Sequence, residues 1–158
     1  MRNAFPMSRA SPESAARLED QVCFALYSAA RAAQQAYRPL LDDLGLTYPQ
    51  YLVLLVLWEQ DGQTVSALGE RLHLDSGTLS PLLRRLDENG FITRERQSTD
   101  ARRVAVHLTA EGQALRSRGA EIQRCLRNAV TLPVEDLMSL RNLSHRFAGS
   151  DVRSPDSA

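Results

Sequence analysis

The segment that decides the fold covers residues 64–108 and reads TVSALGERLHLDSGTLSPLLRRLDENGFITRERQSTDARRVAVHL. Its first part predicts a short helix over residues 65–72, with Ser66 as the N-cap, because apolar residues recur there at helical spacing. These apolar residues are Val65, Leu68 and Leu72. Residues 73–77 interrupt the pattern and predict a turn.

A second helix is expected after this turn, because four leucines recur at positions i, i+3, i+4 and i+7 and would bury one face. They are Leu79, Leu82, Leu83 and Leu86. The opposite face leaves hydrogen-bonding side chains free: Ser76, Thr78, Ser80, Arg84 and Arg85. Pro81 leaves two alternatives for the start. Either Ser80 caps the helix with Pro81 at its first position, or the helix begins near Ser76 and Pro81 bends it.

Beyond Asn89 and Gly90, which signal a helix end, the apolar period changes to two. Two strands are predicted, over 92–96 and 104–108, joined by a polar loop over 97–103 that is too long for a two-residue turn. In this hairpin the arginines outnumber the acidic residues: Arg94, Arg96, Arg102 and Arg103 against Glu95 and Asp100. The hairpin is therefore expected to be cationic.

A helix, a turn, a second helix and a hairpin in this order predict a winged helix-turn-helix, a module that reads DNA. The second helix would enter the major groove of double-stranded DNA, and the cationic wing would reach phosphates or the minor groove. The expected DNA-binding residues are Ser76, Gly77, Thr78, Ser80, Pro81, Arg84, Arg85, Asp100, Arg102 and Arg103. For Arg84 and Arg85 the alternative is solvated helix surface, because exposed arginines are common on helices.

The composition excludes some classes of protein. The chain has 158 residues and a formal net charge of +0, and its 19 cationic residues are all arginine, so any DNA binding must come from local patches. No apolar run approaches the roughly 18 residues of a membrane-spanning helix, and no signal peptide is recognisable, so a cytoplasmic protein is expected. Scattered histidines and two distant cysteines predict neither a metal site nor a cofactor.

Helical patterns also flank the module. They predict a helix over 13–37 ended by Pro39, a helix over 49–60, a helix capped by Thr109 that runs to about Val130, and a last one that begins at Pro133. The fold class is thus mainly α with a small β-hairpin wing, an α+β winged helix-turn-helix with N- and C-terminal dimerisation helices.

Five segments are expected along the chain: a disordered tail at 1–12, N-terminal dimerisation helices at 13–47, the DNA-binding domain at 48–108, C-terminal dimerisation helices at 109–149 and a disordered tail at 150–158. A minimal winged helix does not need the terminal helices, so their apolar stripes most simply bury against a second copy of the chain. A twofold homodimer matches a pseudo-palindromic operator.

Several short motifs resemble those of the MarR family of bacterial regulators, over residues 15–147. The wing sequence Asp100-Ala-Arg102-Arg103 matches the family motif D-x-R-R, in which the acidic residue orients an arginine and an arginine enters the minor groove. The organic hydroperoxide resistance regulators (OhrR) within this family are similar in four stretches: CFALY at 23–27, YRP at 37–39, LTYPQY at 46–51 and LDSGTL at 74–79.

This resemblance implies a redox-sensing repressor that is not an enzyme. In that subfamily the N-terminal cysteine, here Cys23, senses organic hydroperoxide, and a cysteine of the long penultimate helix, here Cys125, closes an intersubunit disulfide with it. Tyr37 and Tyr48 would come from the other subunit. Oxidation of Cys23 is expected to release the operator. The apolar residues expected to favour organic hydroperoxides are Phe24, Leu26, Leu44, Leu46 and Tyr51.

The spacing of cysteine and tyrosine suits this chemistry. A thiol reacts with peroxide as its thiolate, so the site must supply hydrogen-bond donors to the sulfur. Tyr27 lies four residues after Cys23 and can reach it within one helix. Tyr37 lies 14 positions after Cys23, about 21 Å along a straight helix, and cannot touch the sulfur of its own chain. Cys23, Ala30 and Tyr37 repeat every seven residues, a seam that an antiparallel partner helix can match.

Plainer interpretations stay open. The two cysteines fit as inert packing residues, Tyr27, Tyr37 and Tyr48 fit as core or interface aromatics, and Tyr51 is interpreted as core. Two other functions compete. One is a MarR-type repressor induced by non-covalent binding of a small aromatic ligand. The other is a thiol peroxidase, which the lack of a thioredoxin-like βαβ pattern disfavours.

Overall fold

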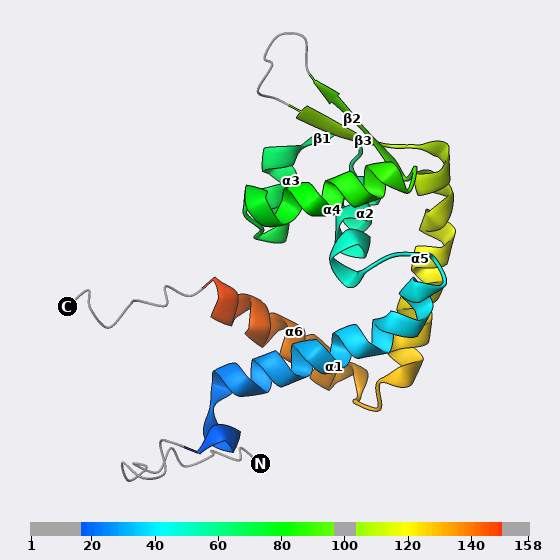
Figure 1. The fold of residues 1–158 in the computed structure, drawn as a ribbon. Helices are drawn as coiled ribbons and strands as arrows, with labels where there is room; N and C mark the ends of the chain where they lie inside the picture. The colour runs from blue at the N-terminus through cyan, green and yellow to red at the C-terminus, as the bar shows by residue number, and fades with distance from the viewer. Residues whose placement is uncertain (1–16, 97–103, 150–158) are drawn as a thin grey trace, which may run out of the picture. The chain divides into compact units, whose positions relative to one another are not determined.

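The computed structural model describes residues 17–96 and 104–149. Its elements are η2 (Leu18–Asp20), α1 (Val22–Asp42), α2 (Tyr48–Glu59), β1 (Gln63–Thr64), α3 (Val65–Leu72), α4 (Ser76–Glu88), β2 (Ile92–Arg96), β3 (Val104–Leu108), α5 (Ala110–Ala129) and α6 (Val134–Ala148). Figure 1 shows α3 and α4 beside the hairpin of β2 and β3. The fold is mainly α with a small antiparallel sheet, as predicted. The tails expected at 1–12 and 150–158 lie outside the described residues.

The chain divides into two compact units, residues 1–123 and 124–158, and the boundary falls inside α5. The first unit contains the elements from η2 to the greater part of α5. The second contains the end of α5 and α6, which begins directly after Pro133 as predicted. In the described ranges, no helix combines the length and the apolar character needed to cross a lipid bilayer.

The sheet has the strand order β1-β3-β2 and is antiparallel throughout. The bounds of β2 and β3 agree with the prediction, because alternating residues mark both strands; Arg94 pairs with Val106 in this register. No periodic pattern in the sequence marks β1, whose two residues pair with Val106 and Ala105. A two-residue strand is too short to show alternation, so only the partner strand reveals it.

Helix α2 forms the centre of the first unit, as its apolar character on all sides predicted. Tyr51, Val53 and Leu54 are fully buried, and Trp58 is almost so. Thr47 and Gln50 form a capping box at its start, in which the Thr47 N–H donates to Gln50 Oε1 at 2.8 Å. This bond satisfies the one buried polar side chain of the described core, Gln50.

The helix-turn-helix has the predicted helices, with one correction at a cap. The N-cap of α3 is Thr64 rather than Ser66: Thr64 Oγ1 accepts from the Ala67 N–H at 3.2 Å, because the helix already begins at Val65. Helix α3 ends at His73, whose φ of 55° lies in the left-handed region.

The second of the two alternatives for α4 is the observed one. The helix begins at Ser76, with Asp75 as its N-cap, and Pro81 lies inside it. Close approach between the two helices depends on Gly69, because a Cβ there would lie 2.8 Å from the Leu74 carbonyl oxygen. A backbone atom at that distance leaves no room for a side chain.

Helix α1 departs from the prediction at both ends. It begins at Val22, because residues 18–20 form a 3-10 turn and Gln21 is extended. It runs through Pro39 to Asp42, so the proline that was expected to end the helix is accommodated within it. Gly45, at φ 65°, provides the real stop, because it lets the Leu46 N–H turn back to the Leu41 carbonyl at 3.0 Å.

Two aromatic side chains of α2 donate hydrogen bonds to the first part of α5. Trp58 Nε1 donates to the Gly112 carbonyl at 2.9 Å, and the Tyr51 hydroxyl donates to the Gly119 carbonyl at 3.3 Å. The two glycines lie seven residues apart and so share one helix face. Thr109 caps the helix as predicted, with Oγ1 accepting from the Gly112 N–H at 3.0 Å.

Candidate DNA interface and sensor site

The N-terminal turn of α4 is polar and is ordered by hydrogen bonds. Asp75 accepts from the Thr78 N–H and from the Thr78 hydroxyl, both at 2.9 Å. These hydrogen bonds hold the pKa of Asp75 below its usual value. The predicted residues Ser76, Gly77 and Ser80 are exposed in this turn, whereas the Thr78 hydroxyl donates its proton to Asp75.

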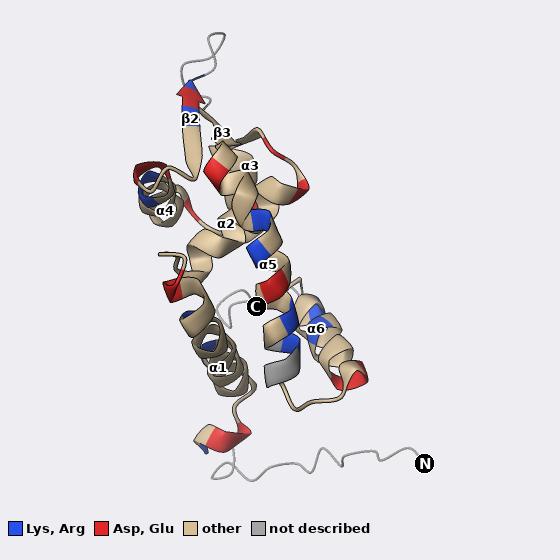
Figure 2. Cartoon of the chain, turned by 90° about the vertical axis from the view of Figure 1, so that its right-hand side faces the viewer, with Lys and Arg blue, Asp and Glu red and all other residues tan. Residues whose placement is uncertain are grey.

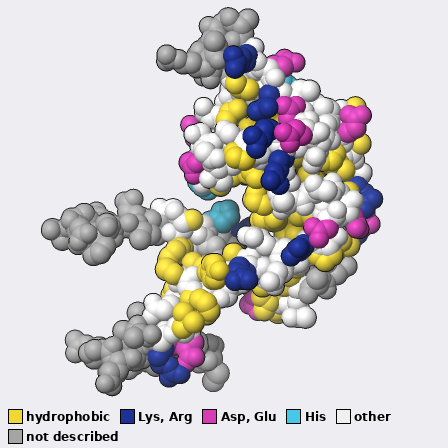
Figure 3. Space-filling model, viewed as in Figure 1, with side chains coloured by type: hydrophobic (Ala, Val, Ile, Leu, Met, Phe, Trp, Pro, Cys, Tyr) yellow, Lys and Arg dark blue, Asp and Glu magenta, His cyan; other side chains and the backbone are white. Residues whose placement is uncertain are grey.

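The predicted arginines of α4 and the hairpin differ in whether they form ion pairs with acidic side chains. Arg84 forms an exposed ion pair with Glu88 at 3.8 Å, and Arg94 binds Asp87 at 2.9 Å, which ties β2 to α4. Arg85 is exposed and has no ion-pair partner within the described ranges. Figure 2 shows the charged positions on β2 and α4, and Figure 3 shows arginines gathered over this face. Among the described residues, Arg85 is therefore the cation of α4 that no acidic side chain pairs.

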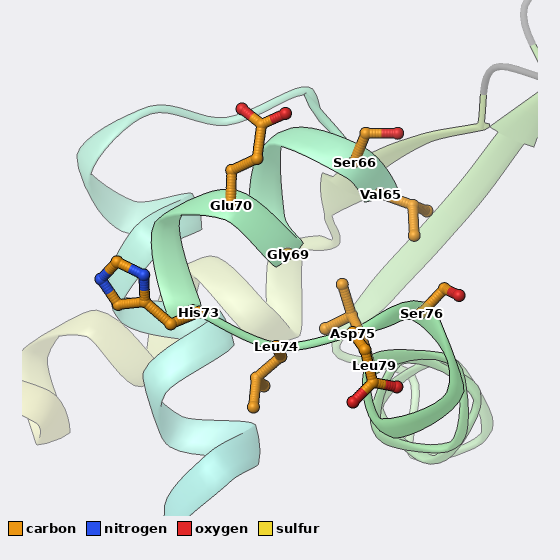
Figure 4. A pocket seen from close by; sticks show the side chains of 9 residues that line it. All are labelled: Val65, Ser66, Gly69, Glu70, His73, Leu74, Asp75, Ser76 and Leu79. Atoms are coloured by element: carbon orange, nitrogen blue, oxygen red, sulfur yellow. The ribbon is translucent and has the colours of Figure 1, made fainter. Parts of the chain in front are cut away.

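Three further predicted DNA-binding residues, Asp100, Arg102 and Arg103, lie outside the described residues. Pro81 is exposed within α4. The turn between α3 and α4 forms a cleft of about 570 Å³, which Figure 4 shows from close by. Gly69 lies at the base of this cleft, and Glu70 and His73 lie along its α3 side.

Cys23 lies in the first turn of α1 and is exposed. Its sulfur has no hydrogen-bond partner within residues 17–96 and 104–149. Tyr27, which was expected to reach it, instead contacts the next turn: its hydroxyl accepts from Arg31 Nη1 at 3.2 Å, and the guanidinium lies 5.6 Å from the centre of its ring. The single chain therefore does not pair Tyr27 with Cys23.

Tyr37 and Tyr48 are brought together, at a ring-centre distance of 4.8 Å, where the end of α1 meets the start of α2. Tyr51 lies 5.9 Å from Tyr37 and stacks edge-on against Trp58. Tyr37 is buried and Tyr48 half-buried. Because α1 is unbroken from Val22 to Asp42, the 14 positions from Cys23 to Tyr37 still span about 21 Å of helix.

The hydroxyl groups of these tyrosines differ in their hydrogen bonds. Tyr51 donates to Gly119 and accepts from Gln123 Nε2 at 3.2 Å, so it is satisfied inside the core as predicted. Tyr37 accepts from the same nitrogen at 3.4 Å. No described group accepts the proton of Tyr37, and the Tyr48 hydroxyl has no hydrogen-bond partner in the described ranges. Two donors therefore remain available side by side.

Burial raises the pKa of Tyr48 above its ordinary value, and the neighbouring hydroxyls of Tyr37 and Tyr51 add to the shift. Burial also raises the pKa of Tyr37, although the hydrogen bond from Gln123 opposes this. Both hydroxyls therefore keep their protons at neutral pH and can act as donors. Gln123 was missed by sequence reasoning, because its partners lie 86 and 72 residues away in the chain.

Cys125 lies on α5 in the second unit and is exposed, with a free thiol. Each unit also exposes large apolar side chains. On the first unit these include Leu18, Val22, Phe24 and Tyr27. On α6 they include Val134, Met138, Leu140 and Leu143. Figure 3 shows apolar atoms over the N-terminal half of α1. Exposed apolar surfaces of this kind are candidate interaction surfaces.

Comparison with known proteins identifies relatives of this chain. The family model of the transcriptional regulators SarA and Rot matches residues 35–118. The organic hydroperoxide resistance transcriptional regulator of Bacillus subtilis (strain 168) is 44% identical over 126 residues, which are 80% of this chain and 86% of that protein.

Two solved structures of AbfR, a protein of Staphylococcus epidermidis, are also similar. Reduced AbfR bound to DNA is 34% identical with a TM-score of 0.71, covering 86% of this chain and 95% of the other. The disulfide form of AbfR is 36% identical with a TM-score of 0.61, covering 85% and 96%.

These relatives are transcriptional regulators rather than enzymes. They share with the chain the winged helix-turn-helix and the flanking helices. The chain accordingly belongs to the MarR family of DNA-binding winged-helix transcriptional regulators, among the relatives of the organic hydroperoxide resistance regulators.

Proposed function

We propose that this protein is a homodimeric repressor that releases its operator when organic hydroperoxide oxidises Cys23. The observation that carries the proposal is the pair of available donors on Tyr37 and Tyr48. They lie where Cys23 of the same chain cannot reach them, about 21 Å along one continuous helix. The exposed Cys23 of a second copy completes the site.

The chemistry begins with the thiolate of Cys23. Hydrogen bonds from Tyr37 and Tyr48 of the partner chain stabilise the negative sulfur, which attacks one oxygen of the peroxide bond. An S–O bond forms, the O–O bond breaks, and the departing alkoxide takes up a proton to become an alcohol. The sulfur is oxidised by two electrons to a sulfenic acid and the hydroperoxide is reduced.

Cys125 of the partner is the resolving thiol in this proposal. Its thiolate attacks the sulfenic sulfur, an S–S bond forms, and the hydroxyl leaves as water after protonation. A disulfide requires Cα atoms within about 7 Å, so any larger separation in the reduced dimer forces a movement. A disulfide form of the relative AbfR supports the proposal that a disulfide belongs to the response.

DNA binding rests on α4 and the wing. The exposed turn from Ser76 to Ser80 lies against phosphates, and Arg85 reaches base edges or phosphate. In the wing, as the family motif implies, Asp100 orients an arginine, and an arginine of the pair Arg102 and Arg103 enters the minor groove. Two such helices must lie about 34 Å apart to enter successive major grooves of a pseudo-palindromic operator. Movement at the dimer interface breaks this spacing and releases the DNA.

The proposal is tested on an operator selected from random DNA by the reduced protein. Fluorescence anisotropy should show at least a tenfold loss of operator affinity after treatment of the wild type with cumene hydroperoxide. Cys23→Ser should bind equally well before and after treatment. Cys125→Ser should give no covalent dimer on a non-reducing gel. Unchanged affinity of the treated wild type contradicts the proposal.

A second candidate function is induction by a small aromatic acid. A hollow of about 470 Å³ lies between α1 and the start of α2, with Leu41, Leu46 and Pro49 as apolar lining and Arg31 and Arg38 at its edge. This combination suits an aromatic ring with a carboxylate. Operator release by salicylate that survives Cys23→Ser would favour this function over thiol oxidation.

A further inference from the structure

We infer that Gln123 is a positioning residue for the sensor, which directs the hydroxyl proton of Tyr37 toward the thiolate sulfur of the partner chain's Cys23. The inference rests on the proposed function. It adds a residue of α5 to a site otherwise made from α1 and α2. Its basis is the direction of each hydrogen bond in the cluster of Tyr37, Tyr51 and Gln123.

The direction of the hydrogen bonds in this cluster follows from the single hydroxyl proton of Tyr51. That proton is donated to the Gly119 carbonyl oxygen at 3.3 Å, and a carbonyl can only accept. The contact between Tyr51 and Gln123 must therefore have the amide as donor. This fixes which end of the Gln123 amide faces the hydroxyls, since the opposite orientation would set two acceptors against each other.

The same amide nitrogen also reaches Tyr37. It carries two hydrogens, so it can donate to Tyr51 at 3.2 Å and to Tyr37 at 3.4 Å together. Tyr37 is thereby made an acceptor on its inner side, and its own proton has to be donated elsewhere. The partner chain's Cys23 thiolate is the acceptor that the proposed function provides.

The hydrogen bond also makes Tyr37 a better donor. A hydroxyl that accepts one hydrogen bond gives a stronger one, because the bonds in a chain polarise one another. The lowering effect of Gln123 on the pKa of Tyr37, against the rise caused by burial, has the same origin. Gln123 thus acts on the sulfur through Tyr37 and does not need to touch it.

Two substitutions in a Cys125→Ser background test this role. Gln123→Met removes the donor, and Gln123→Glu keeps the shape but supplies an acceptor that draws the Tyr37 proton inward. The rate of Cys23 oxidation by cumene hydroperoxide should fall about fivefold in the first and further in the second. The pH profile of Cys23 alkylation should move to higher pH in both. Gln113→Met should match the parent, because Gln113 is exposed on the same helix, as Gln123 is, but its side chain has no hydrogen bond within the described ranges.

A double-mutant cycle separates positioning from general support of the fold. In a Tyr37→Phe background, Gln123→Met should change the oxidation rate no further, because its effect passes through the missing hydroxyl. An equal loss in both backgrounds, or parental rates and alkylation profiles in Gln123→Met and Gln123→Glu, overturns the inference. A parent protein whose Cys23 does not react with hydroperoxide would instead overturn the proposed function.

Discussion

At the scale of single residues, the three clustered tyrosines have different tasks although their rings touch. Tyr51 is fully buried with its hydroxyl bonded twice, whereas Tyr48 is half-buried with no hydrogen-bond partner in the described ranges. Ring burial contributes to stability in each case. Only the hydroxyls of Tyr37 and Tyr48 remain to serve an external acceptor.

Tyr51→Phe should therefore lower the stability of the fold, whereas Tyr48→Phe should lower the rate of Cys23 oxidation. Tyr51→Phe leaves the Gly119 carbonyl without its side-chain donor and should lower the free energy of unfolding by about 1–2 kcal/mol. Tyr48→Phe should change it by less than about 0.5 kcal/mol but should slow Cys23 oxidation. Urea unfolding and stopped-flow oxidation measure the two effects. Similar stability losses in both variants would contradict this division.

Alkaline pH provides a second test at the residue scale. The folded chain holds the pKa values of Tyr37, Tyr48 and Tyr51 above the ordinary 10.0, so above pH 10 it binds more protons than the unfolded chain. Stability should be unaffected by these groups below pH 10 and should fall as pH rises through the folded values. The cationic side chains are all arginine, so no lysine titrates in this window.

Urea unfolding of the Cys23→Ser, Cys125→Ser protein at pH 9 and pH 11 measures this loss. Replacing both cysteines removes the thiols, a class of group that titrates close to this range. The decrease between the two pH values should be smaller in Tyr48→Phe. Equal stability at both pH values in the parent would contradict the raised pKa values.

At the scale of elements, the closeness of α5 to its neighbours depends on glycine. A Cβ at Gly112 would lie 2.0 Å from the Phe91 carbonyl oxygen, and one at Gly119 would lie 2.8 Å from the Trp58 ring. This spacing lets Trp58 and Tyr51 reach the helix carbonyls. This packing of α5 against α2 determines where Gln123 lies, and the hydrogen bond from Gln123 in turn directs the proton of Tyr37.

Gly112→Ala should accordingly lower the free energy of unfolding by about 2 kcal/mol or more, because the methyl group meets backbone rather than a movable side chain. Gly149→Ala is the matched control, since its methyl group would come no closer than 3.4 Å to the His145 carbonyl oxygen. Thermal unfolding followed by circular dichroism compares them. A loss in Gly149→Ala as large as in Gly112→Ala would contradict the explanation.

Elements defined by local periodicity were predictable from sequence. The alternation of β2 and β3 predicted their bounds, and the leucine spacing predicted the buried face of α4 but left its start open between Ser76 and Ser80. The predicted ends of α1 were wrong: Gln21 is extended before the start of the helix, and at the other end Pro39 is accommodated and the left-handed Gly45 follows. The Gln123 hydrogen bonds join residues far apart in the chain, and only the folded structure reveals them.

At the scale of the whole molecule, the exposed apolar side chains of each unit fit the proposed homodimer. Val22 is 62% exposed near the start of α1, and Leu143 is 58% exposed on α6. Leaving such groups in water forgoes about 1.5–3 kcal/mol for each large side chain. In the proposed homodimer, the second copy covers such side chains and brings its Cys23 to Tyr37 and Tyr48.

Leu143→Arg should therefore weaken the dimer, because a buried unpaired charge is costly at an apolar interface. Light scattering with size-exclusion chromatography should show a shift toward monomer, and operator affinity should fall with it. Arg141→Leu, at an exposed polar position of α6, is the control for a change of surface charge. A dimeric Leu143→Arg protein with full operator affinity would contradict this use of α6.

The most direct test is to add hydroperoxide stepwise to the operator-bound wild type and to follow two signals in the same samples. Anisotropy gives the bound fraction of operator, and mass spectrometry gives the fraction of Cys23 joined to Cys125. We expect operator release to rise in proportion to this disulfide and to reverse with dithiothreitol. Release while Cys23 is still a free thiol, or full occupancy after the disulfide is complete, would contradict a repressor controlled by that sulfur.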